Sequence, residues 1–142
     1  MSVNPVRIRL IDHVVIRAKR PAILIAFYRD VLGCTLEKEQ PDLGLYQLRA
    51  GDSLIDIVGI DSELGRNFPR APDDEGPNMD HFCVQIEPWD AEAILAHLAR
   101  HGVESGEVVR RYGARGYGPS IYVQDSEGNT VELKGPPDAD VP

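Results

Sequence analysis

Two histidines and two carboxylates lie within apolar segments of the sequence and recur between its halves. His13 and His81 follow an aspartate at the start of such segments, 68 positions apart. Asp56 and Glu132, 76 positions apart, interrupt the apolar runs Ile-Asp-Ile and Val-Glu-Leu. A buried carboxylate needs a cation, which a lysine or arginine can supply. A single strand histidine is more often a core or rim residue, but the repeated set of imidazoles and carboxylates suits a divalent ion such as Ni, Zn, Mn, Fe or Co.

The elements that carry these residues also repeat. Each histidine opens a strand-like run, and a helical pattern with apolar residues at i, i+3, i+4 and i+7 follows. Pro21 and Asp90 are suited to the first turn and the cap of these two helices, and Gly33 and Gly102 to their ends. The helix-facing residues are Leu24, Phe27, Tyr28 and Val31 in the first half, and Ala91, Ile94, Leu95 and Leu98 in the second.

Two or three strands follow each helix, so we expect two tandem βαβββ modules of α+β class. Residues 7–60 form the first module and residues 79–135 the second, within one domain over 1–142. The proline-rich segment 61–78 has no periodicity and is typical of a linker, and we expect the tail to be frayed. Four strands are expected after the helices, over 44–50, 53–60, 120–124 and 130–134.

The strand period places the polar residues on one face. Because residues i and i+2 share a face, His13 and Arg17 lie together in the first strand, as do His81 and Cys83 in the second module. The same alternation puts the two carboxylates on the face away from the apolar core. One helix covers only one face of each sheet. We therefore expect the two bare faces to curl toward each other and enclose a cleft, within one chain or between two.

Composition excludes several functional classes. The formal net charge is −8, with 15 basic and 23 acidic residues, and the basic residues are scattered. Nucleic acid and anionic membranes are therefore not expected partners. We find no apolar run of membrane-spanning length and no signal peptide pattern, and we expect a soluble, cytoplasmic protein. Cys34 and Cys83 form no metal or disulfide pattern, and we interpret both as buried apolar residues.

The sequence resembles the vicinal oxygen chelate superfamily, which contains glyoxalase I, fosfomycin-resistance thiol transferases, extradiol dioxygenases and bleomycin-resistance proteins. The resemblance runs from about residue 8 to residue 135 and rests on four segments. These are Ile-Asp-His-Val-Val-Ile-Arg over 11–17, Phe-Tyr-Arg-Asp-Val-Leu-Gly over 27–33, Met-Asp-His-Phe over 79–82, and Ser-Ile-Tyr-Val-Gln-Asp-Ser-Glu-Gly-Asn-Thr-Val-Glu-Leu over 120–133.

The resemblance implies curled mixed sheets around a cleft, in a homodimer that completes two metal sites. His13, His81 and Glu132 match the family's ligands, and Asp56 stands where glyoxalase I carries a longer glutamate. A divalent metal ion is the implied cofactor. Glu132 and Asp56 are also the expected catalytic groups, because a carboxylate in this position can move a proton between adjacent carbons.

Four residues are candidates for substrate binding. Arg17 matches the arginine with which glyoxalase I holds a glutathione carboxylate, whereas an asparagine serving the same ligand in bacterial glyoxalase I is replaced here by Ile60. Arg115 and Tyr117 belong to the glycine-rich segment 112–119, which we interpret as a mobile flap over an anionic substrate, with an ordinary surface loop as the alternative. Tyr122 lies on the cleft face and can serve as an acid.

We therefore expect a metal-dependent lyase or isomerase of glyoxalase I type that acts on a small oxygenated substrate. An Fe(II) extradiol dioxygenase using His13, His81 and Glu132 is one alternative, and a thiol transferase is another. The remaining alternative is a metal-free drug-binding resistance protein.

Overall fold

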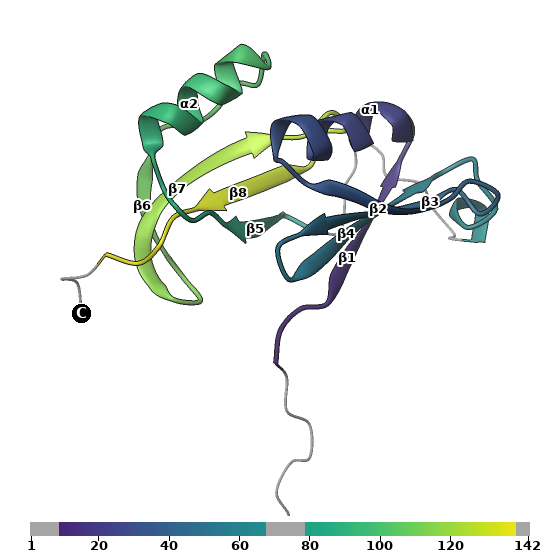
Figure 1. The fold of residues 1–142 in the computed structure, drawn as a ribbon, viewed down its shortest axis with the longest axis horizontal. Coiled ribbons are helices and arrows are strands. Elements are labelled where there is room, and N and C mark those ends of the chain that lie inside the picture. The colour runs from purple at the N-terminus through teal and green to yellow at the C-terminus, as the bar shows by residue number, and fades with distance from the viewer. Residues whose placement is uncertain (1–8, 68–78, 139–142) are drawn as a thin grey trace, which may run out of the picture. The chain divides into compact units, whose positions relative to one another are not determined.

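The computed structural model describes residues 9–67 and 79–138, and the chain divides into two compact units, residues 1–71 and 72–142. Each unit contains a four-stranded mixed sheet with a helix between its first two strands, which confirms the predicted fold class (Figure 1). Among the described residues, no helix is long and apolar enough to cross a membrane.

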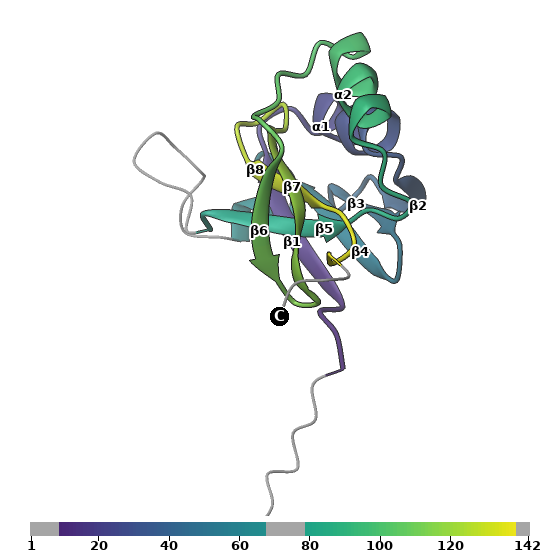
Figure 2. The ribbon, with the colours of Figure 1, turned by 90° about the vertical axis from the view of Figure 1, so that its left-hand side faces the viewer.

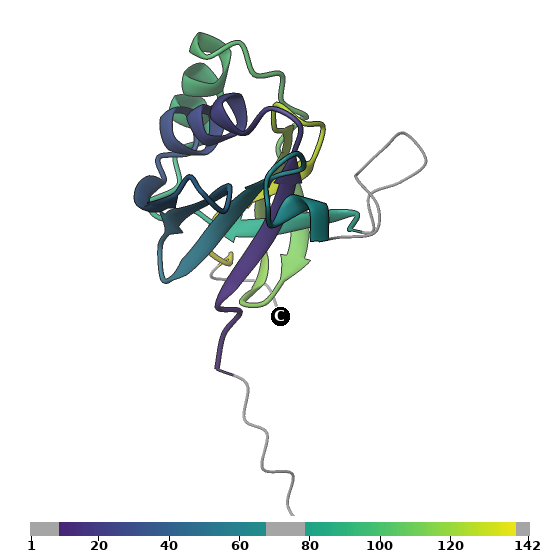
Figure 3. The same cartoon turned by 90° about the vertical axis from the view of Figure 1, so that its right-hand side faces the viewer.

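The first unit is built on the sheet order β1-β4-β3-β2. β1 (His13–Ala18) runs parallel to β4 (Ser53–Gly59), which is antiparallel to β3 (Leu45–Ala50), and β3 pairs with β2 (Thr35–Gln40). Figure 3 faces this unit, with β1 in purple. Its core holds Ile16, Leu24, Tyr28, Leu48 and Ile57.

The first helical segment spans the predicted residues, but its hydrogen-bond pattern changes part-way along it. The α-helix α1 (Pro21–Ala26) begins with proline at its first turn and passes into the π-helical turn η1 (Phe27–Val31). There the amide of Leu32 donates to the carbonyl of Phe27 at 3.2 Å. Gly33 then ends the segment with a φ of +76°, a conformation that glycine adopts without strain.

The second unit repeats this plan with the order β5-β8-β7-β6. β5 (His81–Gln85) runs parallel to β8 (Thr130–Lys134), which is antiparallel to β7 (Gly116–Gln124), and β7 pairs with β6 (Val109–Gly113). Figure 2 shows the β6–β7 hairpin of this unit in green. The buried apolar residues are Leu98, Ile121, Val123, Val131 and Leu133.

The predicted helix boundaries of the second unit are confirmed. α2 (Ala91–Arg100) is capped by Asp90, whose carboxylate accepts from the amide of Ala93 at 3.1 Å, and Gly102 follows the helix with a φ of +68°. The turn before β8 is held by Asp125, which accepts from the amides of Glu127 and Asn129 at 2.9 Å each.

The structure shows the form of two connections that the sequence singles out. Segment 112–119, for which we expect a flap or a surface loop, forms the tip of the β6–β7 hairpin, in which Tyr112 pairs with Tyr117 and Gly113 with Gly116. The beginning of the predicted linker is also structured. Ser62 donates to the carbonyl of Gly59, and η2 (Gly65–Asn67) follows. The rest of the linker, 68–78, and the last residues of the tail lie outside the described residues.

Candidate functional site

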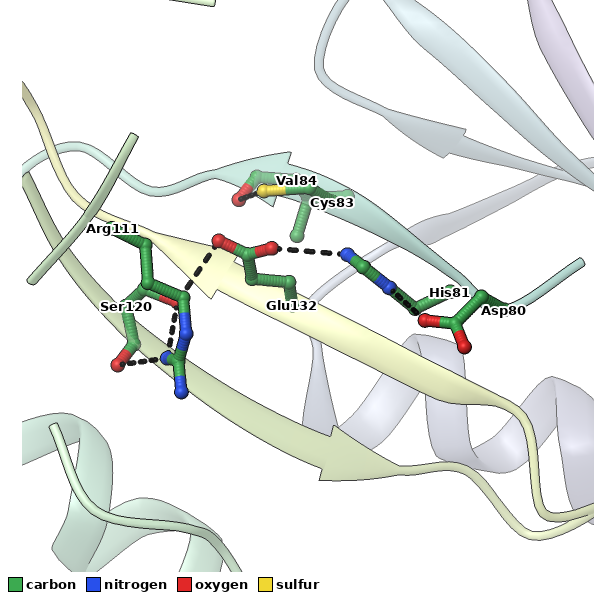
Figure 4. Close-up of polar contacts among 7 residues, drawn as sticks. All are labelled: Asp80, His81, Cys83, Val84, Arg111, Ser120 and Glu132. Carbon is green, nitrogen blue, oxygen red and sulfur yellow. Dashed lines mark hydrogen bonds and ion pairs between the residues drawn. The ribbon is translucent and has the colours of Figure 1, made fainter. Parts of the chain in front are cut away.

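The second unit brings His81 and Glu132 into contact on one face of its sheet. Strand register explains this, since Cys83 is the direct partner of Glu132 and His81 lies two positions earlier on the same face of β5. His81 Nε2 lies 3.2 Å from Glu132 Oε1 (Figure 4). Glu132 is 6% exposed, whereas the side chain of His81 is 30% exposed, so solvent reaches the pair from the histidine side.

The other oxygen of Glu132 is held by a hydroxyl. Ser120 Oγ of β7 donates to Glu132 Oε2 at 2.9 Å, and Arg111 of β6 donates to the same hydroxyl at 2.9 Å. The guanidinium of Arg111 also lies over the ring of Tyr122, 4.2 Å from its centre. The contacts from Arg111 to Ser120 and from Ser120 to Glu132, visible in Figure 4, fix the orientation of a buried carboxylate.

The contacts of His81 leave two hydrogen-bond acceptors facing each other. His81 Nδ1 lies 2.7 Å from Asp80 Oδ2, and a carboxylate only accepts hydrogen bonds. With one proton on Nδ1, Nε2 is left with a lone pair that faces Glu132 Oε1 at 3.2 Å. Two such acceptors need a proton or a metal ion between them.

The first unit presents a looser version of this arrangement. His13 Nδ1 lies 2.7 Å from Asp12 Oδ2, as His81 does from Asp80. Asp56, 4% exposed, accepts from the amide of Gln47 at 3.3 Å and 3.2 Å rather than contacting the imidazole. The hydrogen bond to Asp12 and the charge of Asp56 raise the pKa of His13 above 6.5.

The predicted ligands therefore fall into two pairs, one in each unit. Among the described residues, no group of three or more His, Cys, Asp or Glu side chains is close enough to hold a metal ion. Within the second unit, the donor set fits an ion of intermediate hardness, because an imidazole nitrogen and a carboxylate oxygen converge and a second carboxylate orients the imidazole.

The predicted substrate-binding residues lie at different places. Tyr122 lies on the Glu132 face, with its ring 5.2 Å from that of His81. Tyr117 is five residues earlier in β7 and so faces the opposite side, where its ring packs against Tyr112 at 5.0 Å. Arg115, in the hairpin turn, forms an ion pair with Glu87. Arg17 lies in β1 on the same face as His13.

The structure corrects the expectation for one cysteine. Cys34 is buried as expected, but Cys83 is exposed because it lies on the edge strand β5 and faces the same side as Glu132. Partial burial of the sulfur and the nearby Glu132 carboxylate raise the pKa of the Cys83 thiol to about 11. A thiol of this kind stays neutral at pH 7 and is a poor nucleophile.

Several residues of the site were not singled out by the sequence. Ser120 and Arg111 share a strand face with the predicted site, but only the pairing of β7 with β8, and of β6 with β7, brings them to Glu132. Gln47 reaches Asp56 in the same way, because the two are direct partners across β3 and β4.

Comparison with known proteins identifies the family. Residues 10–133 match the model of the Glyoxalase/Bleomycin resistance protein/Dioxygenase superfamily. The chain belongs to this superfamily. No curated protein matches the chain.

Solved structures of this superfamily's fold resemble the chain along most of its length. A virulence protein from Salmonella typhimurium is 23% identical, with a TM-score of 0.75 over 92% of this chain and 99% of that one. A lactoylglutathione lyase from Agrobacterium tumefaciens is 19% identical, with a TM-score of 0.64 over 89% and 92%. A fosfomycin resistance protein from Listeria monocytogenes is 17% identical, with a TM-score of 0.67 over 90% and 91%. At these identities the likeness shows the fold alone.

Proposed function

We propose that this superfamily member is a divalent-metal-dependent enzyme, a lyase or isomerase of glyoxalase type that acts on a small oxygenated substrate. The observation that carries the proposal is the convergence of His81 Nε2 and Glu132 Oε1 at 3.2 Å while Asp80 engages the other imidazole nitrogen. A divalent ion satisfies both acceptors at once, and superfamily members typically use such ions.

His81 and Glu132 are the first two proposed ligands, and the resemblance adds His13 and Asp56. The aspartates that precede the two histidines accept from their Nδ1 atoms at 2.7 Å in both units. Such partners fix the tautomer that leaves Nε2 able to bind a metal. Asp56 is the weakest proposed ligand, because it is shorter than glutamate and the Gln47 amide occupies its oxygens.

The roles of the residues in turnover follow from their surroundings. When bound, the ion would polarise two neighbouring substrate oxygens and stabilise the negative charge that develops next to a carbonyl. Glu132 and Asp56 are the proposed groups that move a proton between adjacent substrate carbons. Ser120 holds the Glu132 carboxylate in position, Tyr122 lies along the same face, and Arg17 is the proposed partner for an acidic end of the substrate.

Metal content per chain tests this proposal. The protein is purified without an affinity tag or chelator, measured by plasma mass spectrometry, and compared with His81→Ala. We expect about one equivalent of Ni, Zn, Mn, Fe or Co that is lost in the variant. Turnover of the hemithioacetal of methylglyoxal and glutathione with added Ni or Zn then tests the glyoxalase reaction. Absence of metal, with no uptake on dialysis, would overturn the proposal and favour a metal-free binding protein.

An oxygenase is the second candidate, and the position of Tyr122 favours it. Its ring lies edge-on to His81 at 5.2 Å, and Arg111 lies over its face. A phenol in this place can serve as an acid beside an Fe(II) site built from His13, His81 and Glu132. Oxygen consumption with Fe(II) and catechols distinguishes this reaction from the isomerase chemistry.

A further inference from the structure

The second unit contains a buried lysine that the proposed function does not use. Lys134, the last residue of β8, is only 5% exposed. It pairs with Ser120 on β7 and with Gln85 on β5. Because it lies two residues after Glu132, its side chain leaves the same face of the sheet.

Two glycines make room for this side chain. A Cβ added to Gly113 would lie 2.7 Å from Lys134 Cε, and one added to Gly118 would lie 3.0 Å from Lys134 Nζ. Lys134 therefore lies across β7 towards β6. Neither glycine has a positive φ. The two positions therefore need glycine because they lack room for a side chain, and not because of their backbone conformation.

Among the described residues, no acidic group compensates the charge of Lys134. No carboxylate among the described residues lies within 4.0 Å of its ammonium group. Glu132 is engaged by His81 and Ser120, and Arg111 adds a second positive charge on the same face. The carbonyls of Gly135 and Pro136 lie beside the position that a Gly118 Cβ would take, but such dipoles do not neutralise a full charge.

This face thus carries two basic side chains, Arg111 and Lys134, for one buried carboxylate. Burial of an ammonium group without a counter-ion is unfavourable, and a bound anion relieves that cost. A divalent ion at His81 and Glu132 would add to the positive excess. The charge balance therefore selects for an anionic ligand whether or not the metal is present.

We propose that Lys134 binds the acid group of a small anionic ligand, a carboxylate or phosphate-type oxyanion, on this face of the second unit. That the anion is the enzyme's substrate rests on the proposed function, whereas the binding itself does not. Superfamily membership alone does not assign this role to Lys134, which we infer from its burial, its path over the glycines and its charge.

Anion binding by the metal-free protein tests this inference. The full chain is treated with chelator and titrated with inorganic phosphate, and separately with acetate, at constant ionic strength set by chloride. The readout is the movement of the Gly113 and Gly118 amide signals in nitrogen–proton NMR spectra. We expect saturable shifts in the wild type with at least one of the two anions, and Lys134→Met should weaken that binding by roughly tenfold to a hundredfold, the loss expected for a charged hydrogen bond.

Two further variants separate recognition from folding. Gly113→Ala keeps the lysine but displaces its side chain, and should also weaken anion binding. Lys38→Met makes the same substitution at an exposed position of β2 and should bind as the wild type does. The inference is wrong if neither anion produces saturable shifts in the wild type, or if Lys134→Met and Gly113→Ala both retain wild-type affinity while folded.

The outcomes also separate this inference from the proposed function. Phosphate or acetate binding without metal uptake would leave the lysine site standing and overturn the metal-dependent enzyme. Metal uptake without binding of either anion would do the reverse.

Discussion

In both units a histidine and a carboxylate occupy equivalent positions of two paired strands, but different residues hold the carboxylate in place. In each unit the histidine opens the first strand, and the acid pairs with the residue two positions later, Val15 or Cys83. Glu132 contacts its histidine and a serine, whereas among the described residues the Asp56 carboxylate accepts hydrogen bonds only from the amide of Gln47.

Equivalent strand pairing in the two units therefore does not produce equivalent side-chain contacts. The parallel pairing puts both acids on the histidine face, so the backbone treats them alike. Side-chain length and the residue opposite then decide the outcome, because glutamate reaches further than aspartate and Gln47 stands where the second unit has Tyr122. We therefore expect the second unit to supply the stronger pair of proposed metal ligands.

Removal of the two carboxylate charges should have unequal effects. Glu132→Gln is expected to weaken divalent metal binding by more than about a hundredfold and Asp56→Asn by about tenfold, because Glu132 faces the His81 imidazole directly whereas Asp56 is the weakest proposed ligand and is held by Gln47. Calorimetric titration with Zn or Ni measures both. Glu39→Gln, on exposed β2, is the control and should leave affinity unchanged. A larger loss for Asp56→Asn would reverse our ranking of the units.

The hydroxyl that holds Glu132 should contribute to stability. Ser120→Ala leaves a buried carboxylate oxygen and Arg111 without that partner, and we expect a loss of about 2 kcal/mol in the free energy of unfolding. Urea unfolding followed by circular dichroism measures it. Ser53→Ala, which removes an exposed hydrogen bond to Ile11, should cost less than about 1 kcal/mol. Equal losses would show that Ser120 does not support the buried carboxylate.

Asp80 should orient the His81 imidazole for metal binding without being a metal ligand itself. Asp80→Ala removes the partner of Nδ1 and is expected to lower metal affinity by about tenfold, as outer partners of metal ligands do. Asp12→Ala should cost less, because His13 belongs to the weaker pair. Competition with a metal-binding dye measures both variants, with exposed Asp52→Ala as the control. Unchanged affinity for Asp80→Ala would exclude this orienting role.

The smallest expected effect concerns the protonation of His13. Its pKa is raised mainly by the hydrogen bond to Asp12 and further by Asp56, so Asp12→Asn should lower the pKa more than Asp56→Asn does. The raised pKa means that this contact stabilises the folded state below pH 6.5, and that the contribution is lost as pH rises through the folded-state pKa. NMR titration of the His13 ring proton in metal-free protein measures the shift, with Asp42→Asn as control. The reverse order of the two variants would contradict this assignment.

The elements that the sequence predicts are those with a clear apolar period or with helix-capping and turn residues at their ends. β8 occupies the predicted residues 130–134, and Asp90 caps α2 as expected. β2 and β6 were not predicted as strands, because they are polar and lack apolar alternation. They form by pairing with β3 and β7, as edge strands whose pattern is set by their neighbours.

The sequence by itself determined which residues of the site share a face. Strand side chains alternate with a period of two. The sequence alone therefore places His81 and Cys83 on one face of their strand, and Glu132 and Lys134 on one face of theirs. Only the tertiary structure decided what each group contacts. The Ser120 contact to Glu132 and the position of Lys134 over Gly113 depend on register between strands distant in sequence, and no local pattern encodes that register.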